Sequence, residues 1–281
     1  MKNRGIIPIN KPKDWTSFDV VNKFKYKLKP LKVGHLGTLD PMATGVLLVT
    51  VGKATKLFDI MQEKRKTYVA TFQFGYETDT LDSTGKIESS CEYIPTQEKI
   101  SKVLPKFIGK ISQIPPLYSA KSVNGVRAYE LARQGVEFEL KPKVVEIFNI
   151  KLLSYMNGSL TLEIECGSGT YIRSIGRDIA YELGSLATMT NLVRTKVGNF
   201  DLDDCLNIQE IDDVNQAIVP INSVLSFEKL NLNEKEIFKL LNGQQLNLIK
   251  PNGVYALEDE YDIIALVEIK ENIAKMSLFL G

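Results

Sequence analysis

The chain has 281 residues, of which 44% are hydrophobic and 25% are charged, values typical of a globular protein with one large domain and a small one. It contains no run of about 18 apolar residues, and the N-terminal stretch MKNRGIIPINKPKDW lacks the apolar core of a secretory signal, so we expect no membrane span and a cytoplasmic location. Three widely separated cysteines and a single histidine argue against a disulfide framework and against a zinc site.

The net charge of +1 conceals an uneven distribution along the chain. Residues 1–66 carry 14 lysines and arginines against 5 acidic residues, a balance of +9, whereas residues 201–281 carry 6 against 15, a balance of −9. The basic N-terminal part predicts a polyanionic partner, with a solvated basic face as the alternative. In KFKYKLKPLK, residues 23–32, five lysines alternate with apolar and aromatic residues, a mixture suited to phosphates beside stacking surfaces.

In the first part of the chain, the spacing of apolar residues predicts several elements. TSFDVVNKFKYKL begins with helix-capping residues and predicts a helix over about 18–28, which ends at Pro30. VLLVTVG, residues 46–52, predicts a buried strand, although periodicity does not exclude a buried helix. TYVATFQFGY alternates as a strand does, and TDTLDSTG after it predicts a turn.

Further along, a helix is expected over 97–108, followed by an excursion rich in proline, serine and glycine that contains a helical patch around Tyr129–Arg133. VVEIFNIKLLSY and LTLEIEC, joined by MNGS, predict a β-hairpin. The next segment predicts a helix from about Thr170 that is closed by Gly184. Strands and helices mix without regular alternation, which favours an α+β fold. From about residue 205 the chain becomes acidic and predicts a short β-rich region, with a domain boundary near 226.

Two common kinds of catalytic or cofactor motif are incomplete. VGKATK has the Gly-Lys pair of a phosphate-binding loop but lacks its earlier glycine, and CGSGTY does not complete a GxGxxG pattern, so we expect no nucleotide cofactor. A Ser-His-Asp hydrolase would have to use His35, yet no GxSxG motif supplies its serine.

The stretch GHLGTLDPMATGVLLV, residues 34–49, contains the candidate catalytic carboxylate. Gly34 and Gly37 permit backbone conformations that other residues resist, and Pro41 restricts Asp40 toward extended geometry, so we expect Asp40 at a loop tip. An ordinary turn before a strand is the alternative. Arg173 falls in the first turn of a predicted helix, where the helix dipole disfavours a cation, so a nearby anion is expected: a carboxylate such as Asp40 or an RNA phosphate. A solvated arginine is the alternative.

These stretches together resemble a known family. GHLGTLDPMATGVL, KTYVATFQFGYETDTLDSTG, QIPPLYSAKSVNGVRAYELARQG, and GTYIRSIGRDIAYELG followed by NLVRTKVGNF are similar, in this order, to motifs of the bacterial tRNA pseudouridine synthase B (TruB) family. The resemblance spans about residues 5–200. INKPKDWTSFDVV also resembles the family's first motif, usually KPxGxTS, with Asp14 and Trp15 in place of the common glycine and its neighbour.

The resemblance implies an isomerase that converts uridine 55 in the T loop of tRNA to pseudouridine, without a metal or other cofactor. It implies a pseudouridine synthase fold, in which helices flank a central mixed or antiparallel sheet. It also implies a catalytic domain over residues 1–226, with an RNA-gripping insertion at about 113–143, and a small β-rich PUA-like domain over 227–281. The expected partner is the T stem-loop of tRNA, and no obligatory protein partner is evident.

The resemblance also implies the site residues. Asp40 would be the essential carboxylate, through attack on the sugar C1′ or through a glycal, and the two routes stay open. Tyr68 would stack on the target base and is a candidate for removing the C5 proton, while Arg173 would pair with the aspartate. The residues implied to bind substrate are Lys11, His35, Tyr68, Tyr171 and Leu192, and those implied to hold RNA in the insertion are Lys121, Arg127, Arg133, Lys141 and Lys143. A non-catalytic RNA-binding or tRNA-folding protein is the alternative function, although such a protein could lose Asp40, which this chain retains.

Overall fold

The computed structural model describes residues 3–62 and 65–281, which divide into two compact units. The first unit comprises the residues up to 41, residues 46–62 and residues 199–281, and the second comprises residues 42–45 and 63–198. Strand β3 (Thr44–Val51) therefore begins in the second unit and continues in the first. Among the described residues, no helix is long and apolar enough to cross a membrane.

In the first unit, helix α1 (Ser17–Lys27) confirms the helix predicted over 18–28. It begins with a capping box, in which the Thr16 hydroxyl accepts from the Asp19 amide and the Asp19 carboxylate accepts from the Thr16 amide. The Thr16 hydroxyl also donates to the Asp19 carboxylate at 2.6 Å, and this hydrogen bond, followed by that from the Thr16 amide and then by the charge of Lys11, holds the pKa of Asp19 below its ordinary value. Val20, Val21 and Phe24 form the buried side of the helix.

The strands of the N-terminal part of this unit run in the order β14-β1-β3, and β2 pairs with β3 in antiparallel fashion. Strand β3 is buried over almost its whole length, which settles the predicted choice between strand and helix in favour of a strand. The other elements before residue 226 in this unit are β1 (Gly5–Lys11), β2 (Val33–Leu36), α2 (Phe58–Gln62), β13 (Phe200–Asp201), β14 (Leu206–Asn207) and α6 (Val214–Ala217).

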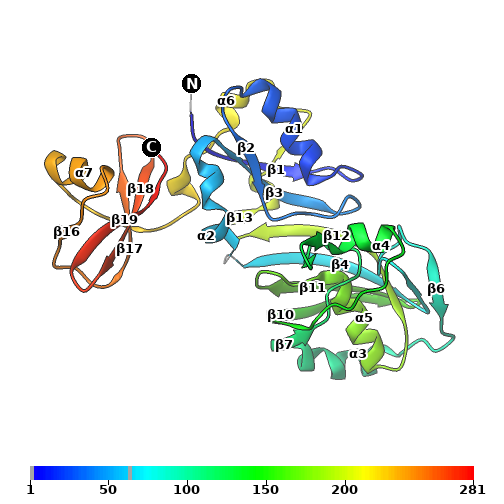
Figure 1. Ribbon diagram of the computed structural model, residues 1–281. Coiled ribbons are helices and arrows are strands. Elements are labelled where there is room, and N and C mark those ends of the chain that lie inside the picture. The colour runs from blue at the N-terminus through cyan, green and yellow to red at the C-terminus, as the bar shows by residue number, and fades with distance from the viewer. Residues whose placement is uncertain (1–2, 63–64) are drawn as a thin grey trace. The chain divides into compact units, whose positions relative to one another are not determined.

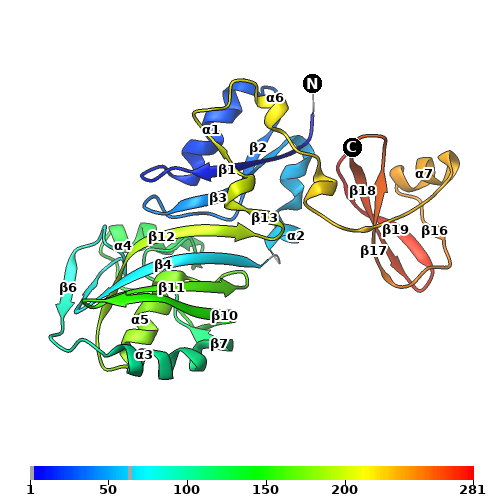
Figure 2. The ribbon, with the colours of Figure 1, turned by 180° about the vertical axis from the view of Figure 1, so that it is seen from behind.

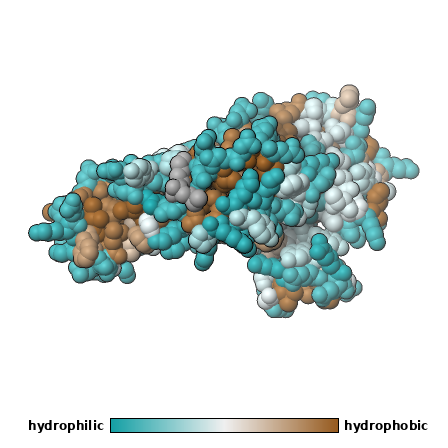
Figure 3. Space-filling model, turned by 90° about the horizontal axis from the view of Figure 1, so that it is seen from above, coloured by the Kyte–Doolittle hydropathy of each residue, from teal (hydrophilic) through white to brown (hydrophobic). Residues whose placement is uncertain are grey.

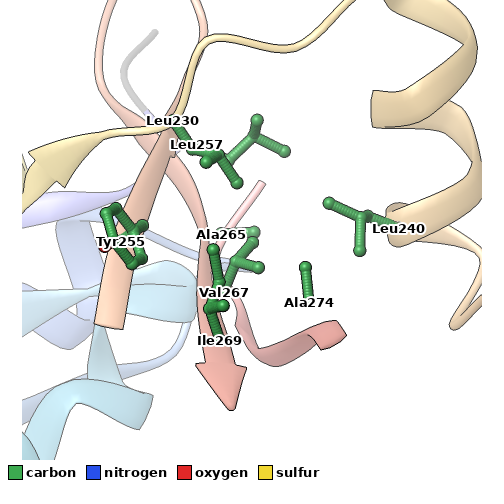
Figure 4. Close-up of a cluster of buried hydrophobic side chains, with 8 residues drawn as sticks. All are labelled: Leu230, Leu240, Tyr255, Leu257, Ala265, Val267, Ile269 and Ala274. Carbon is green, nitrogen blue, oxygen red and sulfur yellow. The ribbon is translucent and has the colours of Figure 1, made fainter. Parts of the chain in front are cut away.

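The acidic C-terminal part of the first unit forms a β-rich domain with its own five-stranded sheet, in the order β15-β17-β18-β19-β16. Its strands are β15 (Glu228–Lys229), β16 (Leu246–Asn247), β17 (Gly253–Glu258), β18 (Ile263–Lys270) and β19 (Ile273–Phe279), and its helix is α7 (Glu234–Leu241). Leu240 of α7 belongs to the same buried cluster as Tyr255, Leu257 and Val267 of the sheet (Figure 4). This part therefore has its own apolar core, and the boundary near residue 226 stays a prediction.

The second unit is built on antiparallel strands in the order β12-β4-β11-β10-β7. The first residues of β3 pair with β12 in parallel fashion, so the sheet is mixed, as predicted. Helix α5 (Ile172–Glu182) lies against this sheet (Figures 1 and 2), and a Cβ atom at Gly176 would stand 2.2 Å from the ring of Phe72 on β4. Glycine at this position therefore lets the helix backbone approach the sheet closely.

Most elements of the second unit confirm the sequence patterns. The hairpin of β10 and β11 is present, and its turn residues Asn157 and Gly158 both have positive φ, as a tight hairpin turn requires. The helix predicted over 97–108 is α3 followed by a short 3-10 helix over Leu104–Phe107. The bounds are β4 (Lys66–Phe74), β5 (Tyr76–Thr78), β6 (Ile87–Ser90), α3 (Gln97–Val103), β7 (Gly109–Gln113), β8 (Ser122–Val123), β9 (Val126–Arg127), α4 (Ala128–Arg133), β10 (Lys143–Met156), β11 (Ser159–Cys166) and β12 (Ala187–Val197).

Candidate active site

The loop that carries Asp40 lies between β2 and β3 of the first unit and is held through its backbone. The Leu39 amide donates to the Ser17 hydroxyl at 2.9 Å, and this hydroxyl also lies 3.2 Å from the Leu39 carbonyl oxygen. On the other side, the Pro41 carbonyl accepts from the Lys11 ammonium at 3.2 Å and from the Asp14 amide at 2.8 Å. These four contacts lie on either side of Asp40, which is half-buried. They use the backbone atoms of Leu39 and Pro41, and none of the four involves the Asp40 carboxylate.

Lys11, at the end of β1, is completely buried. Besides the Pro41 carbonyl, its ammonium reaches the carbonyl oxygens of Pro12 at 2.8 Å and Trp15 at 2.6 Å. A buried ammonium that contacts three carbonyls ties the segment after β1 to the Asp40 loop. The structure therefore gives Lys11 a role in holding the loop, and its predicted contact with substrate stays a prediction.

His35 and the two glycines before Asp40, Gly34 and Gly37, do not all lie in the loop. Gly34 and His35 lie in strand β2, where His35 is half-buried and stands opposite Val49 of β3. Of Gly34 and Gly37, which were expected to allow unusual backbone conformations, only Gly37 has a left-handed backbone, with φ of 83°. Gly34 instead lies beside Thr50, whose hydroxyl oxygen would be 3.2 Å from an added Cβ atom. Asp40 itself lies in a loop, as predicted.

Asp14 stands where the family's first motif commonly has glycine, and it adopts the backbone that glycine favours. Its φ is +66°, and its amide donates the hydrogen bond to Pro41. Aspartate is among the few residues that enter this left-handed region at moderate cost. The departure from the motif therefore preserves the shape of the segment that anchors the Asp40 loop.

We expect Asp14→Val to lower the free energy of unfolding by about 1–2 kcal/mol, because a β-branched side chain resists a positive φ. Asp14→Gly should keep or slightly raise the stability, because glycine enters this region without a steric penalty. Thermal denaturation of the two variants checks this. Lys13→Val, at the exposed neighbour without a positive φ, is the matched control, and an equal loss there would contradict the explanation.

In the second unit, Tyr68 on β4 and Leu192 on β12 share one face of the sheet. Leu192 pairs with Ala70, two residues from Tyr68, and side chains two residues apart in a strand point the same way. Both residues are buried, with Tyr68 8% exposed and Leu192 4% exposed. Phe72 continues this face and meets Gly176 of α5, so the helix that carries Arg173 packs on the face of Tyr68.

Arg173, in the first turn of α5, is 7% exposed, so the alternative of a solvated arginine is wrong. Its guanidinium donates to the carbonyl oxygens of Thr80 at 2.9 Å and Tyr118 at 3.1 Å. It also forms an ion pair with the Asp82 carboxylate at 3.4 Å. The anion expected beside a cation at this end of a helix is thus present as Asp82. The predicted partner Asp40 belongs to the other unit, and its pairing with Arg173 stays a prediction.

Asp82 organises the turn that the sequence predicted over TDTLDSTG. One oxygen of its carboxylate accepts from the Thr80 hydroxyl at 2.9 Å, the Thr84 amide at 3.0 Å and the Thr84 hydroxyl at 2.5 Å. Its other oxygen faces Arg173. The turn is therefore built around a buried carboxylate that also fixes the arginine. Sequence reasoning predicted the turn but missed this link, because nothing in the spacing of the two segments reveals that they meet.

Tyr171 immediately precedes α5 and is held by β7. Gln113, at the end of β7 and almost fully buried, accepts from the Tyr171 amide at 2.8 Å and donates to the Tyr171 carbonyl at 3.2 Å. This two-way amide contact fixes the backbone from which the Tyr171 and Arg173 side chains project. Gln113 was not identified from the sequence, where it reads as an ordinary polar residue before the proline-rich excursion.

The predicted RNA-gripping excursion consists of β8, β9 and α4 with long connections. Arg127, Arg133, Lys141 and Lys143 are exposed, whereas Lys121 is half-buried and donates to the Lys141 carbonyl at 3.2 Å. Arg133 also lies over the ring of Tyr129, 5.6 Å from its centre. Four of the five predicted basic side chains are thus exposed in a segment with little regular structure.

Two further basic residues are buried, Lys66 on β4 and Arg194 on β12. Neither was identified from the sequence. Burial, and then the charge of Arg194, lower the pKa of Lys66, while burial raises the pKa of the neighbouring Cys166 thiol to about 11. Lys66 and Tyr68 are two residues apart on β4, and Arg194 pairs with Tyr68 across the sheet. Two basic side chains, Lys66 and Arg194, therefore share the face of the sheet that carries Tyr68. Among the described residues, no group of three or more His, Cys, Asp or Glu could hold a metal ion.

Comparisons with known proteins add a family context to this geometry. Residues 23–172 match the model of the TruB family pseudouridylate synthase, N-terminal domain. A tRNA pseudouridine synthase B of Dehalococcoides mccartyi is 40% identical over 94% of this chain and 92% of its own length. The enzyme of the same name from Parabacteroides distasonis is 47% identical over 77% of this chain and 95% of its own length.

The solved structures agree in fold. A chain in the crystal structure of a Cbf5-Nop10-Gar1 complex matches with a TM-score of 0.73 and 23% identity, over 99% of this chain and 84% of that one. A chain in the structure of an H/ACA RNP bound to a substrate RNA containing 2′-deoxyuridine matches with a TM-score of 0.70 and 21% identity, over 99% of this chain and 84% of that one. At these identities the likeness concerns the fold alone, and it is the expected α+β fold.

Proposed function

The chain belongs to the TruB family of pseudouridylate synthases and is therefore an isomerase that makes pseudouridine in RNA, and we propose that its substrate is uridine 55 in the T loop of tRNA. Relatives that are 40% or more identical over most of the chain are named for this activity on tRNA, which supports the proposal. The observation in the structure that supports it best is the mounting of Asp40, whose loop is anchored at Leu39 and Pro41 on either side of the carboxylate.

The reaction rearranges one nucleoside and needs no other reactant. The bond between N1 of uracil and C1′ of ribose breaks, the base turns, and C5 bonds to C1′; the C5 proton leaves and N1 gains one. Asp40 is the essential carboxylate, either by attack on C1′ or in a glycal route. Its ionised form is required in both, and the proposed pairing with Arg173 would favour that form. No step requires a metal or a redox cofactor.

The other predicted residues help to bring the target base out of the T loop and to position it at Asp40. A base inside the folded T loop must be flipped out, at a cost of a few kcal/mol of unstacking. Tyr68 stacks on the flipped uracil and is the candidate for removing the C5 proton, while Tyr171 and Leu192 line its pocket. His35 helps to occupy the vacated space or holds the flipped nucleotides. Lys11 supports the Asp40 loop and is also proposed to contact the substrate.

The RNA is recognised by shape and phosphates as well as by the flipped base. Residues 113–143, with exposed Arg127 and Arg133, grip the T stem-loop. The proposed catalytic domain spans 1–226, and 227–281 is the PUA-like domain, whose acidic balance predicts only limited RNA affinity. The enzyme is proposed to act in the cytoplasm without an obligatory protein partner.

A tRNA transcript labelled with tritium at C5 of its uridines tests the substrate, because joining C5 to C1′ releases the tritium. We expect the purified chain alone to release one equivalent per tRNA, and a transcript with cytidine at position 55 to release none. Release that persists with cytidine 55 would place the reaction elsewhere. No release from either transcript would contradict the proposed substrate.

A further inference from the structure

The exposed face of α1 combines lysines with aromatic rings in a way that the proposed reaction does not use. The buried face of this helix, with Val20, Val21 and Phe24, packs into the core. On the opposite side, Phe18 is 59% exposed and Tyr26 is 74% exposed. They are eight residues apart, slightly more than two helical turns, so their side chains project within about 80° of each other around the helix axis. Two large aromatic side chains on a short solvent-facing helix are not explained by packing.

The lysines beside these rings are exposed and have few acidic neighbours in the sequence. Residues 17–58 contain seven lysines and two acidic residues, Asp19 at the start of α1 and Asp40. Lys23, Lys25, Lys27 and Lys29 are all exposed, and the Lys29 ammonium lies 5.2 Å from the centre of the Tyr26 ring. On the face of the molecule shown in Figure 3, hydrophilic side chains cover much of the surface and hydrophobic ones are exposed between them. A ring flanked by ammonium groups suits a stacked base between phosphates.

The positive charge continues beyond the helix. Pro30, Leu31 and Lys32 line a hollow of about 390 Å³, to which Lys53 and Lys56 also contribute. Lys53 and Lys56 donate to the carbonyl oxygens of Gly281 and Phe279, so the exposed Lys32 is the basic side chain that lengthens the path of a polyanion along α1. This favours an extended, flexible polyanion over a compact ligand.

The position of this surface on α1 indicates which part of an RNA it meets. Ser17, at the start of the helix, anchors the Asp40 loop, whereas Lys25 follows eight residues later, roughly 12 Å further along the axis. The nucleotide that reacts at Asp40 does not extend this far. The T stem is base-paired, so its bases are not available for stacking on Tyr26.

We propose that the exposed face of α1, with Phe18, Lys25 and Tyr26, together with Lys29 just after the helix, binds an unpaired segment of tRNA outside the T arm. This inference rests on the proposed function and adds a second RNA contact to it. The aromatic rings stack on bases and the lysines contact phosphates, so the surface adds affinity for whole tRNA without sequence-specific readout.

Binding of two RNAs tests this proposal: full-length tRNA and an isolated T-arm hairpin. Lys25→Gln with Lys29→Gln should raise the dissociation constant for full-length tRNA about tenfold. The slope of the logarithm of the binding constant against the logarithm of the salt concentration should become less steep by about 1.4–1.8, the value for two phosphate contacts. The hairpin should be affected less than about twofold. Tyr26→Ala should weaken the binding of full-length tRNA about fivefold with little change in the salt slope, because stacking releases no counterions. Tyr26→Phe keeps the ring and should bind full-length tRNA as the wild type does.

Lys235→Gln with Lys239→Gln on α7 removes the same charge from another exposed helix and is the matched control. Equal weakening of both RNAs by the α1 variant, an equal effect of the α7 variant, or no effect on either RNA would overturn the proposal. Pseudouridine formation by the wild-type chain in the hairpin reports the proposed function separately. An inactive wild-type chain would therefore count against the proposed function. The α1 contact is judged separately, from the dissociation constants of the two RNAs.

Discussion

Asp40→Asn is expected to lower the rate of pseudouridine formation by about 10⁴-fold or more, the scale seen when a group that reacts with substrate is removed. An amide has the shape of the carboxylate but cannot attack C1′ or accept a proton as a carboxylate does. The loop should keep its conformation, since Ser17, Lys11 and Asp14 hold it through Leu39 and Pro41. We therefore expect tRNA affinity to change less than about threefold.

Single-turnover rates with saturating enzyme separate this chemical defect from binding. Asp59→Asn is the control, because Asp59 is an exposed carboxylate in the same unit and has no proposed part in the reaction. Its rate should equal that of the wild type. A rate for Asp40→Asn within about tenfold of wild type would remove Asp40 from the mechanism, and so would a loss fully explained by weaker tRNA binding.

Arg173→Lys is expected to lower the turnover number about 100-fold while KM changes little. The planar guanidinium reaches the Thr80 carbonyl, the Tyr118 carbonyl and Asp82 at the same time. A lysine ammonium is a point charge that cannot reproduce this geometry, and a buried carboxylate that loses its partner is costly. The proposed pairing with Asp40 would be lost as well, so the effect should appear in the chemical step.

Arg177→Lys is the matched control, one helical turn further along α5. Arg177 forms an ion pair with the adjacent Asp178 and donates to the Ile114 carbonyl, but it has no proposed role in the reaction. We expect less than a threefold change in its turnover number. Equal loss of turnover and affinity in Arg173→Lys would instead indicate that Arg173 binds an RNA phosphate. Melting temperatures of both variants show whether the buried contacts of Arg173 also matter for stability.

The elements that sequence could predict are those whose periodicity is undisturbed. Helix α1 has a capping box and regular apolar spacing, and the β10–β11 hairpin has alternating apolar residues around an Asn-Gly turn. Strand β12 escaped prediction because its register shifts twice, between Met189 and Asn191 and between Arg194 and Lys196. Each shift moves the following side chains to the other face, so buried residues do not recur at every second position.

The residues of the candidate site also fall into those that a local sequence pattern indicates and those whose contacts only the folded structure shows. Asp40 and Arg173 could be proposed from local signals, a proline-restricted aspartate and a cation at a helix start. Lys11, Asp82 and Gln113 act through contacts with segments that are distant in sequence: Pro41, Arg173 and Tyr171. No local pattern encodes these contacts, because they depend on how the sheet and its connections pack. Lys11 was expected to bind substrate, and its contact with Pro41, like the contacts of Asp82 and Gln113, was found only in the folded structure.

The proposed reaction of this chain is the isomerisation of one uridine of tRNA, at position 55. Mapping of pseudouridine at nucleotide resolution in a full-length unmodified tRNA, after incubation with the purified chain alone, tests it most directly. We expect complete conversion at position 55 and no conversion at any other uridine. Conversion at a different uridine, or an unmodified position 55 in tRNA that the chain demonstrably binds, would contradict it.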